Sequence, residues 1–156
     1  MEKEELLVNY LIEKGYHITF AESLTAGMLP AKLVNVANAS MVLNESFVTY
    51  SNEAKMKYLG VKKETIDKYT VVSEEVAKEM ALGAAKKSNA NIAVTTTGVA
   101  GPTGGSELTP VGTVCFGFYI NGNVITKTKH FGNIGRNNVR LAATNYAFDE
   151  LLELLK

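Results

Sequence analysis

The order in which helical and strand-like patterns follow one another constrains the fold of this chain more than any other feature. Apolar residues recur first at helical spacing and then in short runs typical of strands. The predicted elements, in order, are helix 3–14, strand 17–21, helix 23–36, strand 43–50, short helices near 52–60 and 64–68, helix 73–87, strands 91–97, 111–120 and 123–131, and a last helix from about 137. Helices that alternate with strands early, and a hairpin at Asn121-Gly122 late, predict a three-layer α/β/α domain with a mixed sheet.

Length and charge restrict the function classes. A chain of 156 residues is long enough for one compact domain, expected over 1–156. Lys and Arg together equal Asp and Glu at 16 each, so no net field draws the chain to nucleic acid or to an anionic membrane. The single cysteine, Cys115, lies in an alternating apolar run and is expected to be a packed thiol, which excludes disulfide scaffolds and cysteine zinc sites. The charged first residues lack the apolar core of a signal peptide, so we expect a cytoplasmic location.

The first candidate site is the segment 21–27, AESLTAG, where a predicted strand leads into a predicted helix. A hydroxyl at Ser23 can attack a carbonyl group while backbone N–H groups at the start of the helix stabilise the oxyanion that develops. Serine is also a preferred helix cap. The motif alone therefore leaves both capping and catalysis open.

The second candidate site is the segment 50–55, YSNEAK, again at a strand end followed by a helix start. A serine nucleophile needs a base, and His17 and His130 lie in strand-like sequence away from both motifs, so a serine–lysine pair is the economical alternative. Lys55 would then have to be neutral, which requires that burial or a nearby positive charge lowers its pKa. A solvated helix lysine is the other interpretation, and Tyr50 fits a packed aromatic residue equally well.

Two further motifs have features of ligand binding. The segment 97–106, TGVAGPTGGS, contains glycines that allow close approach of a ligand and can direct N–H groups at an anion. It matches neither a P-loop nor a dinucleotide fingerprint, so a flexible loop and a ligand loop are both open. Arg136 precedes the last helix, where it can bind a phosphate group together with the helix N–H groups. Arg140 either assists it or pairs with a carboxylate.

In order and spacing, these motifs resemble the CinA C-terminal domain family, the bacterial nicotinamide-nucleotide amidases. The family pattern contains A-E-S-x-T-G-G, F-x-T-Y-S-N-x-A-K, L-G-V, V-S-E-E-V-A, T-G-x-A-G-P-x-G-G, P-V-G-T-V and a G-x-R-x-x-V-R-like element. This chain reads AESLTAG, FVTYSNEAK, LGV, VSEEVA, TGVAGPTGG, PVGTV and GRNNVR. The resemblance covers nearly the whole chain.

The resemblance implies a mixed, mostly parallel five-stranded sheet, a homodimer, and hydrolysis of nicotinamide mononucleotide to nicotinate mononucleotide and ammonia. It implies no cofactor and no metal. Ser23 resembles the nucleophile, Lys55 the general base and Tyr50 a residue that assists both. The residues expected to bind the substrate are Glu22, Thr25, Gly27, Asn52, Thr97, Gly98, Gly101, Gly104, Gly105 and Arg136.

Among these, Arg136 is expected to meet the phosphate, and Glu22 either orients Lys55 or a substrate hydroxyl or is structural. Three residues depart from the family pattern. Leu24 stands where a cysteine is frequent, Ala26 replaces the first of two glycines, and Thr109 replaces a lysine before P-V-G-T-V. Ala26 can tighten backbone access to the nucleophile, and the change at Thr109 removes a charge that can touch the substrate.

These departures keep two alternatives open. One is a noncatalytic homologue that binds a pyridine nucleotide, and the other is an amidase for another small amide that lacks the phosphate. The resemblance also implies that the larger amino-terminal domain of full-length CinA proteins, and its activity, are absent here.

Overall fold

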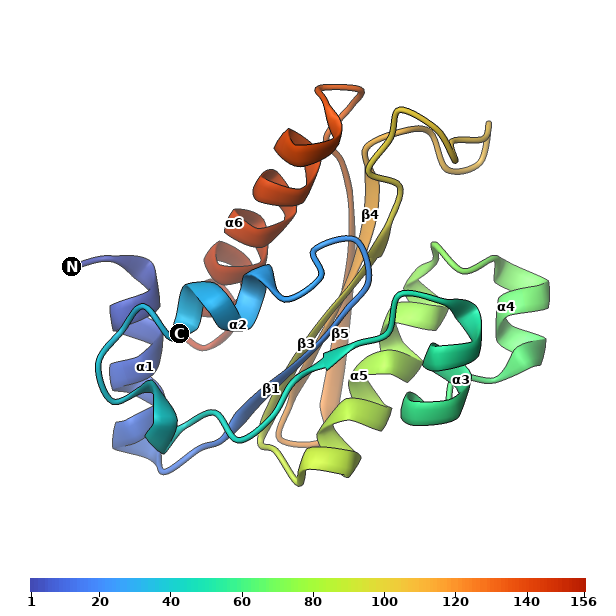
Figure 1. The fold of residues 1–156 in the computed structure, drawn as a ribbon. Helices are drawn as coiled ribbons and strands as arrows, with labels where there is room; N and C mark the ends of the chain where they lie inside the picture. Colours follow the sequence, from blue (N-terminus) through green and yellow to red (C-terminus); the bar gives the residue numbers. More distant parts are fainter.

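The computed structural model describes residues 1–156 (Figure 1). Helices and strands alternate in the first half of the chain, and two adjacent strands precede the last helix. The elements are α1 (Lys3–Lys14), β1 (Ile18–Glu22), α2 (Met28–Leu33), a 3₁₀ turn (Ala39–Met41), β2 (Phe47–Val48), α3 (Asn52–Leu59), α4 (Lys63–Tyr69), α5 (Glu74–Ser88), β3 (Ile92–Gly98), β4 (Thr113–Ile120), β5 (Asn123–His130) and α6 (Arg136–Leu154).

The five strands form one mixed sheet in the order β2-β1-β3-β4-β5. Strand β1 pairs in parallel with both β2 and β3, whereas β4 is antiparallel to β3 and to β5. It follows that β5 again runs in the direction of β3, so that only β4 opposes the other strands. The β4–β5 hairpin turns at Asn121 and Gly122, whose φ angles of 46° and 98° are typical of the turn predicted there. The mixed, mostly parallel sheet with a late hairpin is confirmed.

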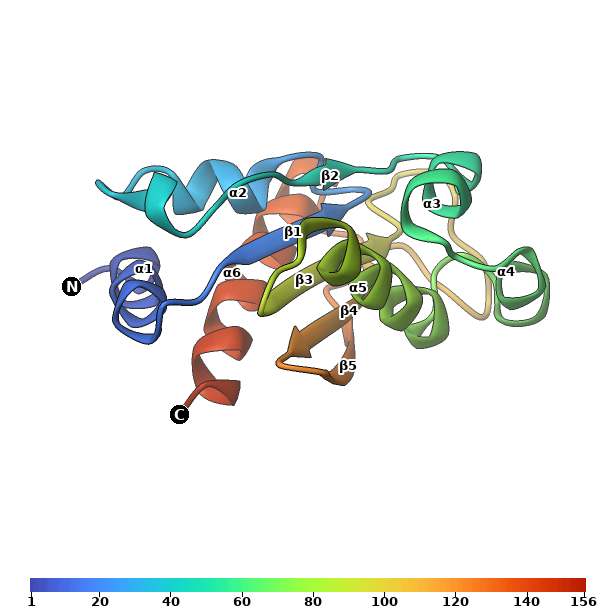
Figure 2. The same ribbon diagram turned by 90° about the horizontal axis from the view of Figure 1, so that it is seen from below.

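Helices cover both faces of this sheet, as Figures 1 and 2 show from two directions. Helices α1, α2 and α6 lie on one face and share the larger apolar core with the strands, including Leu7, Phe20 and Phe148. Helix α5 lies on the other face with α3 and α4 beside it, and its Met80 belongs to a smaller core. The predicted three-layer α/β/α sandwich is therefore confirmed.

Local sequence signals account for several helix boundaries. Ser73 Oγ accepts a hydrogen bond from the Val76 N–H at 3.2 Å and begins α5, with two glutamates in the first turn as the helix dipole favours. Gly15 and Gly60, with φ angles of 69° and 72°, end α1 and α3 in the left-handed conformation. Where capping residues are present, the predicted boundaries agree with the structure.

Two predicted elements are wrong in extent. The strand expected over 43–50 is reduced to Phe47–Val48 and an isolated bridge from Leu43, because the Glu45 carbonyl accepts the Thr19 hydroxyl at 2.9 Å instead of joining a ladder. The helix expected over 23–36 spans only Met28–Leu33. The residues that precede it form a turn, which a buried side chain described below holds in place.

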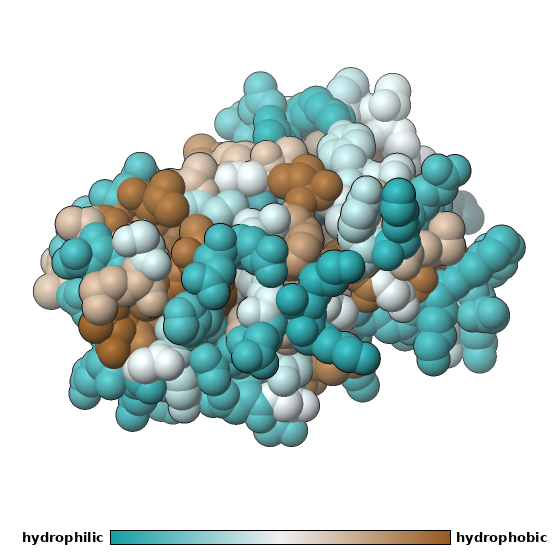
Figure 3. Space-filling view, turned by 60° about the horizontal axis from the view of Figure 1, so that its bottom comes forward, coloured by the Kyte–Doolittle hydropathy of each residue, from teal (hydrophilic) through white to brown (hydrophobic).

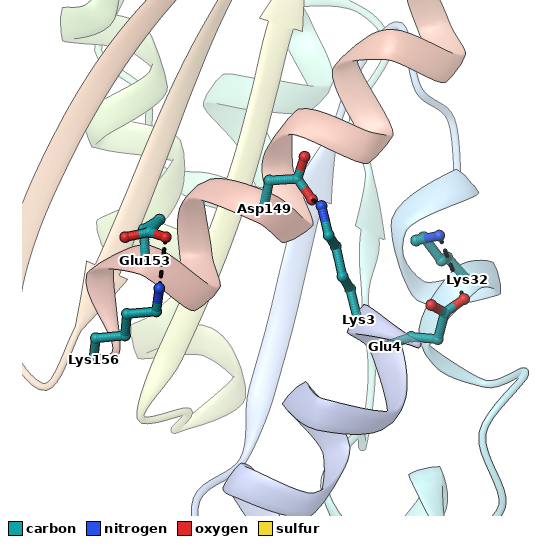
Figure 4. Close-up of polar contacts among 6 residues, drawn as sticks. All are labelled: Lys3, Glu4, Lys32, Asp149, Glu153 and Lys156. Carbon is teal, nitrogen blue, oxygen red and sulfur yellow. Dashed lines mark hydrogen bonds and ion pairs between the residues drawn. The ribbon is translucent and has the colours of Figure 1, made fainter. Parts of the chain in front are cut away.

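Few interactions on the surface contribute strongly to stability. Lys3 pairs with Asp149 across α1 and α6, Lys32 lies 3.3 Å from Glu4, and Lys156 pairs with Glu153 (Figure 4). Partly exposed pairs of this kind contribute about 0–1 kcal/mol each. Hydrophilic residues surround the exposed apolar ones on the face in Figure 3. None of the helices combines the length and the apolar character that a membrane span requires.

Candidate active site

The carboxyl ends of β1, β2 and β3, which pair in parallel, meet at one cavity of about 270 Å³. Ser23 follows β1, Tyr50 follows β2, and Gly98 ends β3, while Arg136 reaches the cavity from the start of α6. Ligands in open α/β sheets commonly bind outside the carboxyl ends of the strands. The topology thus brings together four motifs, the first and last of which are more than a hundred residues apart in the sequence.

Ser23 lines this cavity with a free hydroxyl group. The residue is 9 % exposed, and its Oγ forms no hydrogen bond with the protein. Helix α2 begins only at Met28 with Gly27 at its cap position, so Ser23 does not cap a helix. The capping interpretation is wrong, and the hydroxyl is available to a ligand.

Lys55 is a buried lysine that lines the cavity. It is only 1 % exposed, and its Nζ donates to the carbonyl oxygens of Thr49 at 2.8 Å and Tyr50 at 3.4 Å, with no carboxylate partner. Burial lowers the pKa of Lys55 from 10.5 to about 8, because desolvation disfavours the charged amine. The interpretation as a solvated helix lysine is wrong. No direct hydrogen bond joins the amine to Ser23, although both line the same cavity.

Arg136 closes one side of the cavity through two hydrogen bonds. Its Nη2 donates to the Tyr50 hydroxyl at 2.9 Å, and its Nη1 donates to the Gly101 carbonyl at 2.8 Å. Tyr50 is 57 % exposed, so it is not a packed aromatic residue. No acidic side chain lines the cavity. Two basic groups without a carboxylate partner favour a ligand that carries negative charge.

Glu22 is not in the cavity, contrary to the expectation that it meets the substrate. Its side chain is fully buried, and its oxygens accept hydrogen bonds from the Thr25 hydroxyl at 2.7 Å and from the N–H groups of Gly27 and Leu29 at 2.9 Å. Desolvation raises the pKa of Glu22, although these hydrogen bonds and Arg140 act in the opposite direction. The carboxyl group holds the turn after Ser23, which is why α2 begins late.

Thr25 and Gly27 are likewise outside the cavity, although both were expected to bind substrate. The Thr25 side chain is fully buried between Glu22 and Thr96, whose hydroxyl lies 2.9 Å away. Gly27 has a φ angle of 97° and donates its N–H to Glu22. Both residues shape the turn that carries Ser23.

A substitution at this carboxyl group has a predictable cost. Glu22→Ala removes the acceptor of three donors, two of which are buried, and we expect the free energy of unfolding to fall by about 2–4 kcal/mol. Chemical denaturation at neutral pH measures this change. Glu53→Ala is the control, since Glu53 is exposed at the start of α3, and it is expected to change stability by less than about 0.5 kcal/mol. Equal stabilities of the two variants would contradict the role of Glu22.

Only some of the residues expected from the glycine-rich segment line the cavity. Thr97, Gly98 and Gly104 line the cavity, as does Asn52 of α3, whereas Gly101 and Gly105 do not. Gly101, at a φ angle of 86°, packs so closely that a Cβ atom would lie 2.4 Å from Val111 Cγ1. The carbonyl oxygen of Gly101 instead accepts the hydrogen bond from Arg136 Nη1. The hydroxyl of Thr97 donates to the Val71 carbonyl at 3.0 Å and so ties the cavity to the segment before α5.

Six lining residues were not predicted, and five of them are apolar or small. They are Leu24, Val71, Val72, Val99, Ala100 and Thr103. The valines before α5 carry no chemical signal in the sequence, so only the packing of that segment against β3 reveals them. The residues adjacent to Ser23 and to Gly98 are identifiable by their position alone.

Arg140 and the two histidines lie outside the cavity. Arg140 Nε donates to the Leu24 carbonyl at 2.7 Å and Nη1 to Asn137 at 3.2 Å, so it neither lines the cavity nor forms an ion pair. His130 Nδ1 lies 3.2 Å from the Thr113 hydroxyl, and His17 is also remote from the cavity. Cys115 is 3 % exposed, and burial raises its thiol pKa, which confirms the packed thiol.

Of the three residues that depart from the family pattern, only one lines the cavity. Leu24 lines it, whereas Thr109 bonds Ser106 through the two hydroxyl groups at 3.1 Å and lines a separate hollow. Thr109 itself therefore does not line the cavity. Ala26 is exposed and has a φ angle of 41°. In this left-handed conformation a glycine is less strained than an alanine.

Ala26→Gly is expected to stabilise the protein slightly. Relief of a left-handed conformation is favourable by about 1 kcal/mol, and the greater freedom of glycine in the unfolded chain offsets about half of that. Thermal unfolding should show a midpoint higher by about 1–2 °C. Ala31→Gly, at an exposed helical position of α2, is the matched control and should lower the midpoint. A lower midpoint for both variants would show that residue 26 is unstrained.

The volume of a cavity does not by itself identify the active site. A wider groove of about 660 Å³ lies between α1 and the end of α6. Its charged residues include Lys3, Asp149, Glu153 and Lys156, which form ion pairs with one another (Figure 4). It contains neither a free hydroxyl nucleophile nor a buried base. The smaller cavity at the strand ends is the candidate active site because it contains both.

An open, mixed α/β sheet with a serine, a buried lysine and an arginine around one cavity defines a class of α/β proteins with a small-molecule site at the strand ends. The chain belongs to the CinA C-terminal domain family, whose model matches residues 1–155.

Known relatives agree with this assignment in sequence and in structure. A CinA-like protein of Kosmotoga olearia is 49 % identical over 94 % of this chain, and a relative from Clostridium kluyveri is 47 % identical over 96 %. The chain spans only 35–36 % of the length of these two relatives. A competence or damage-inducible protein from Enterobacter asburiae has a crystal structure that superposes with a TM-score of 0.96 at 36 % identity, over 99 % of this chain and 97 % of that one. The protein CihA from Agrobacterium tumefaciens gives 0.91 at 39 % identity, over 100 % and 98 %.

Proposed function

We propose that the protein hydrolyses the carboxamide of nicotinamide mononucleotide to nicotinate mononucleotide and ammonia. The observation that carries this proposal is Lys55, a buried amine with a pKa of about 8 and no carboxylate partner, in the same cavity as the free hydroxyl of Ser23. Such an amine is partly neutral near physiological pH and can accept a proton. Stability alone does not favour a lysine here, since burial of a charge without a carboxylate partner is unfavourable.

The reaction begins with attack of Ser23 Oγ on the amide carbon while Lys55 accepts the hydroxyl proton. Lys55 then donates this proton to the nitrogen, so that ammonia leaves and an ester to Ser23 remains. Water then attacks the ester while the neutral amine of Lys55 accepts its proton, and Lys55 returns this proton to Ser23 Oγ as the acid product leaves and ionises to the carboxylate. Catalytic hydrogen bonds are often completed only when substrate is bound, which is consistent with the missing bond between the two side chains.

The charge of the cavity supports a substrate that bears a phosphate group. Arg136 is exposed at the rim, and its guanidinium already spans from Tyr50 to the loop at Gly101. A phosphate group can replace these two neutral acceptors and form stronger, charge-assisted hydrogen bonds. The pyridinium charge of the substrate would further favour the neutral form of Lys55.

Arg136→Ala is expected to raise KM for nicotinamide mononucleotide at least about tenfold with little change in kcat, because binding of a remote phosphate is lost. Ammonia release at varied substrate concentration measures both constants. The riboside, which lacks the phosphate, is the matched control and should be processed equally by wild type and variant. An unchanged KM for the mononucleotide would favour an amidase for another small amide.

Three further features belong to the same proposal. The reaction needs no cofactor and no metal, because a serine ester and a lysine base suffice for it. The family resemblance supports a homodimer that acts in the cytoplasm. A noncatalytic homologue would bind the nucleotide without release of ammonia, and the measurement that closes the Discussion separates the two functions.

A further inference from the structure

A run of unpaired backbone donors directly follows β1. The N–H groups of Ser23, Leu24 and Thr25 have no hydrogen-bond acceptor within the protein. The three residues are 9 %, 4 % and 0 % exposed. More than nine in ten buried N–H groups in proteins are paired, so three consecutive exceptions require an explanation.

The run is confined to these positions. The next N–H groups are all satisfied: Ala26 donates to the Ser23 carbonyl at 3.1 Å, Met28 to the Thr25 carbonyl at 2.9 Å, and Gly27 and Leu29 to Glu22. The turn is therefore well ordered by its own hydrogen bonds. Poor local packing does not account for the free donors.

Two of the three residues, Ser23 and Leu24, line the cavity. Successive N–H groups in a turn can form a concave site for an anionic oxygen. Since α2 begins only at Met28, the donors belong to the turn itself and not to the first turn of a helix. No carboxylate lines the cavity that would repel such an oxygen.

We propose that the N–H groups of Ser23 and Leu24 bind the oxyanion that forms during amide hydrolysis, a site that rests on the function proposed above. When Ser23 Oγ bonds to the amide carbon, the π electrons of the carbonyl move to its oxygen, and the two N–H groups donate to the resulting negative charge. When ammonia leaves, that electron pair re-forms the carbonyl of the ester. Water attack on the ester creates a second oxyanion at the same place.

The buried Glu22 and the half-buried Arg140 hold this site in position. Glu22 accepts hydrogen bonds from Gly27 and Leu29 on the carboxyl side of the turn. Arg140, from α6, donates to the Leu24 carbonyl at 2.7 Å and so fixes the peptide that follows the Leu24 N–H. Both are positioning residues, since neither lines the cavity. The site is thus arranged before substrate binds, which is the condition under which such donors are most effective.

Replacement of the amide at residue 24 by an ester, through incorporation of the α-hydroxy analogue of leucine, removes this N–H and keeps the side chain. We expect kcat for ammonia release to fall about 10²-fold with KM within about twofold. The same exchange at Val34, whose N–H is paired with the Pro30 carbonyl at 3.0 Å beyond this turn and outside the cavity, is the matched control and should leave kcat within about threefold. Wild-type kcat in a folded residue-24 ester would overturn the oxyanion site.

A second measurement covers the case in which the ester chain does not fold. On addition of nicotinate mononucleotide to the wild-type protein, the amide proton resonances of Ser23 and Leu24 should shift downfield as they bond the product carboxylate, and that of Ala26 should not. Unshifted resonances in the saturated complex would overturn the proposal. Wild-type protein that releases no ammonia would instead overturn the proposed function itself.

Discussion

Ser23→Ala should lower kcat for nicotinamide mononucleotide by at least about 10⁴-fold, since loss of a serine nucleophile cannot be compensated by the remaining groups. The substitution removes one oxygen atom that has no hydrogen bond within the protein, so no buried partner is left unpaired. Stability and nucleotide affinity should therefore be nearly unchanged. Steady-state ammonia release, thermal unfolding and titration calorimetry measure the three quantities.

The matched control for this variant is Ser73→Ala. Ser73 caps α5 and lies outside the candidate active site, so its replacement should cost about 1 kcal/mol of stability while kcat is retained. The two serine variants thus have opposite expected effects. A Ser23→Ala protein with the wild-type rate would show that another group attacks the amide.

Lys55→Met is expected to lower kcat by about 10²–10⁴-fold and to stabilise the fold at neutral pH. The rate falls because the general base is lost. Stability rises because a buried, unpaired ammonium is replaced by an apolar chain of similar length, a change of about 1–3 kcal/mol. Lys57→Met, at an exposed position of the same helix, is the control and should alter neither quantity appreciably.

The pH dependence of kcat/KM and of stability tests whether Lys55 causes both the loss of rate and the gain of stability. The wild-type kcat/KM should rise with pH and reach half its maximum near pH 8, where the amine loses its proton. The folded-state pKa lies below the unfolded value of 10.5, so the unfolded chain binds more protons between about pH 8 and 10.5. The free energy of unfolding of the wild type, relative to that of Lys55→Met, must therefore increase as the pH rises from about 8 to 10.5. A stability difference independent of pH would contradict the burial of the free amine.

Much of the fold could be predicted because it depends on local signals. Periodicity located the helices, and Ser73, Gly15 and the Asn121-Gly122 pair marked boundaries that the structure confirms. The turn after Ser23 could not be predicted in this way. It depends on a buried carboxylate, Glu22, whose partners lie up to seven residues away and whose sequence context resembles a helix start.

The candidate site was predictable by resemblance more than by chemistry. Lys55 and its exposed neighbour Lys57 lie two residues apart in one helix, and only the tertiary structure shows that Lys55 is buried. Arg140 and Leu24 are 116 residues apart, so no local pattern indicates their hydrogen bond. Contacts of this kind arise from the packing of α6 against the strand ends.

The most direct test of the proposed activity is the incubation of purified wild-type protein with nicotinamide mononucleotide, with ammonia and nicotinate mononucleotide measured together. We expect the two products in equal amounts, at a rate that rises toward pH 8, and none from Ser23→Ala prepared in parallel. Tight binding of the nucleotide with no ammonia from either protein would contradict the amidase and indicate a noncatalytic nucleotide-binding protein.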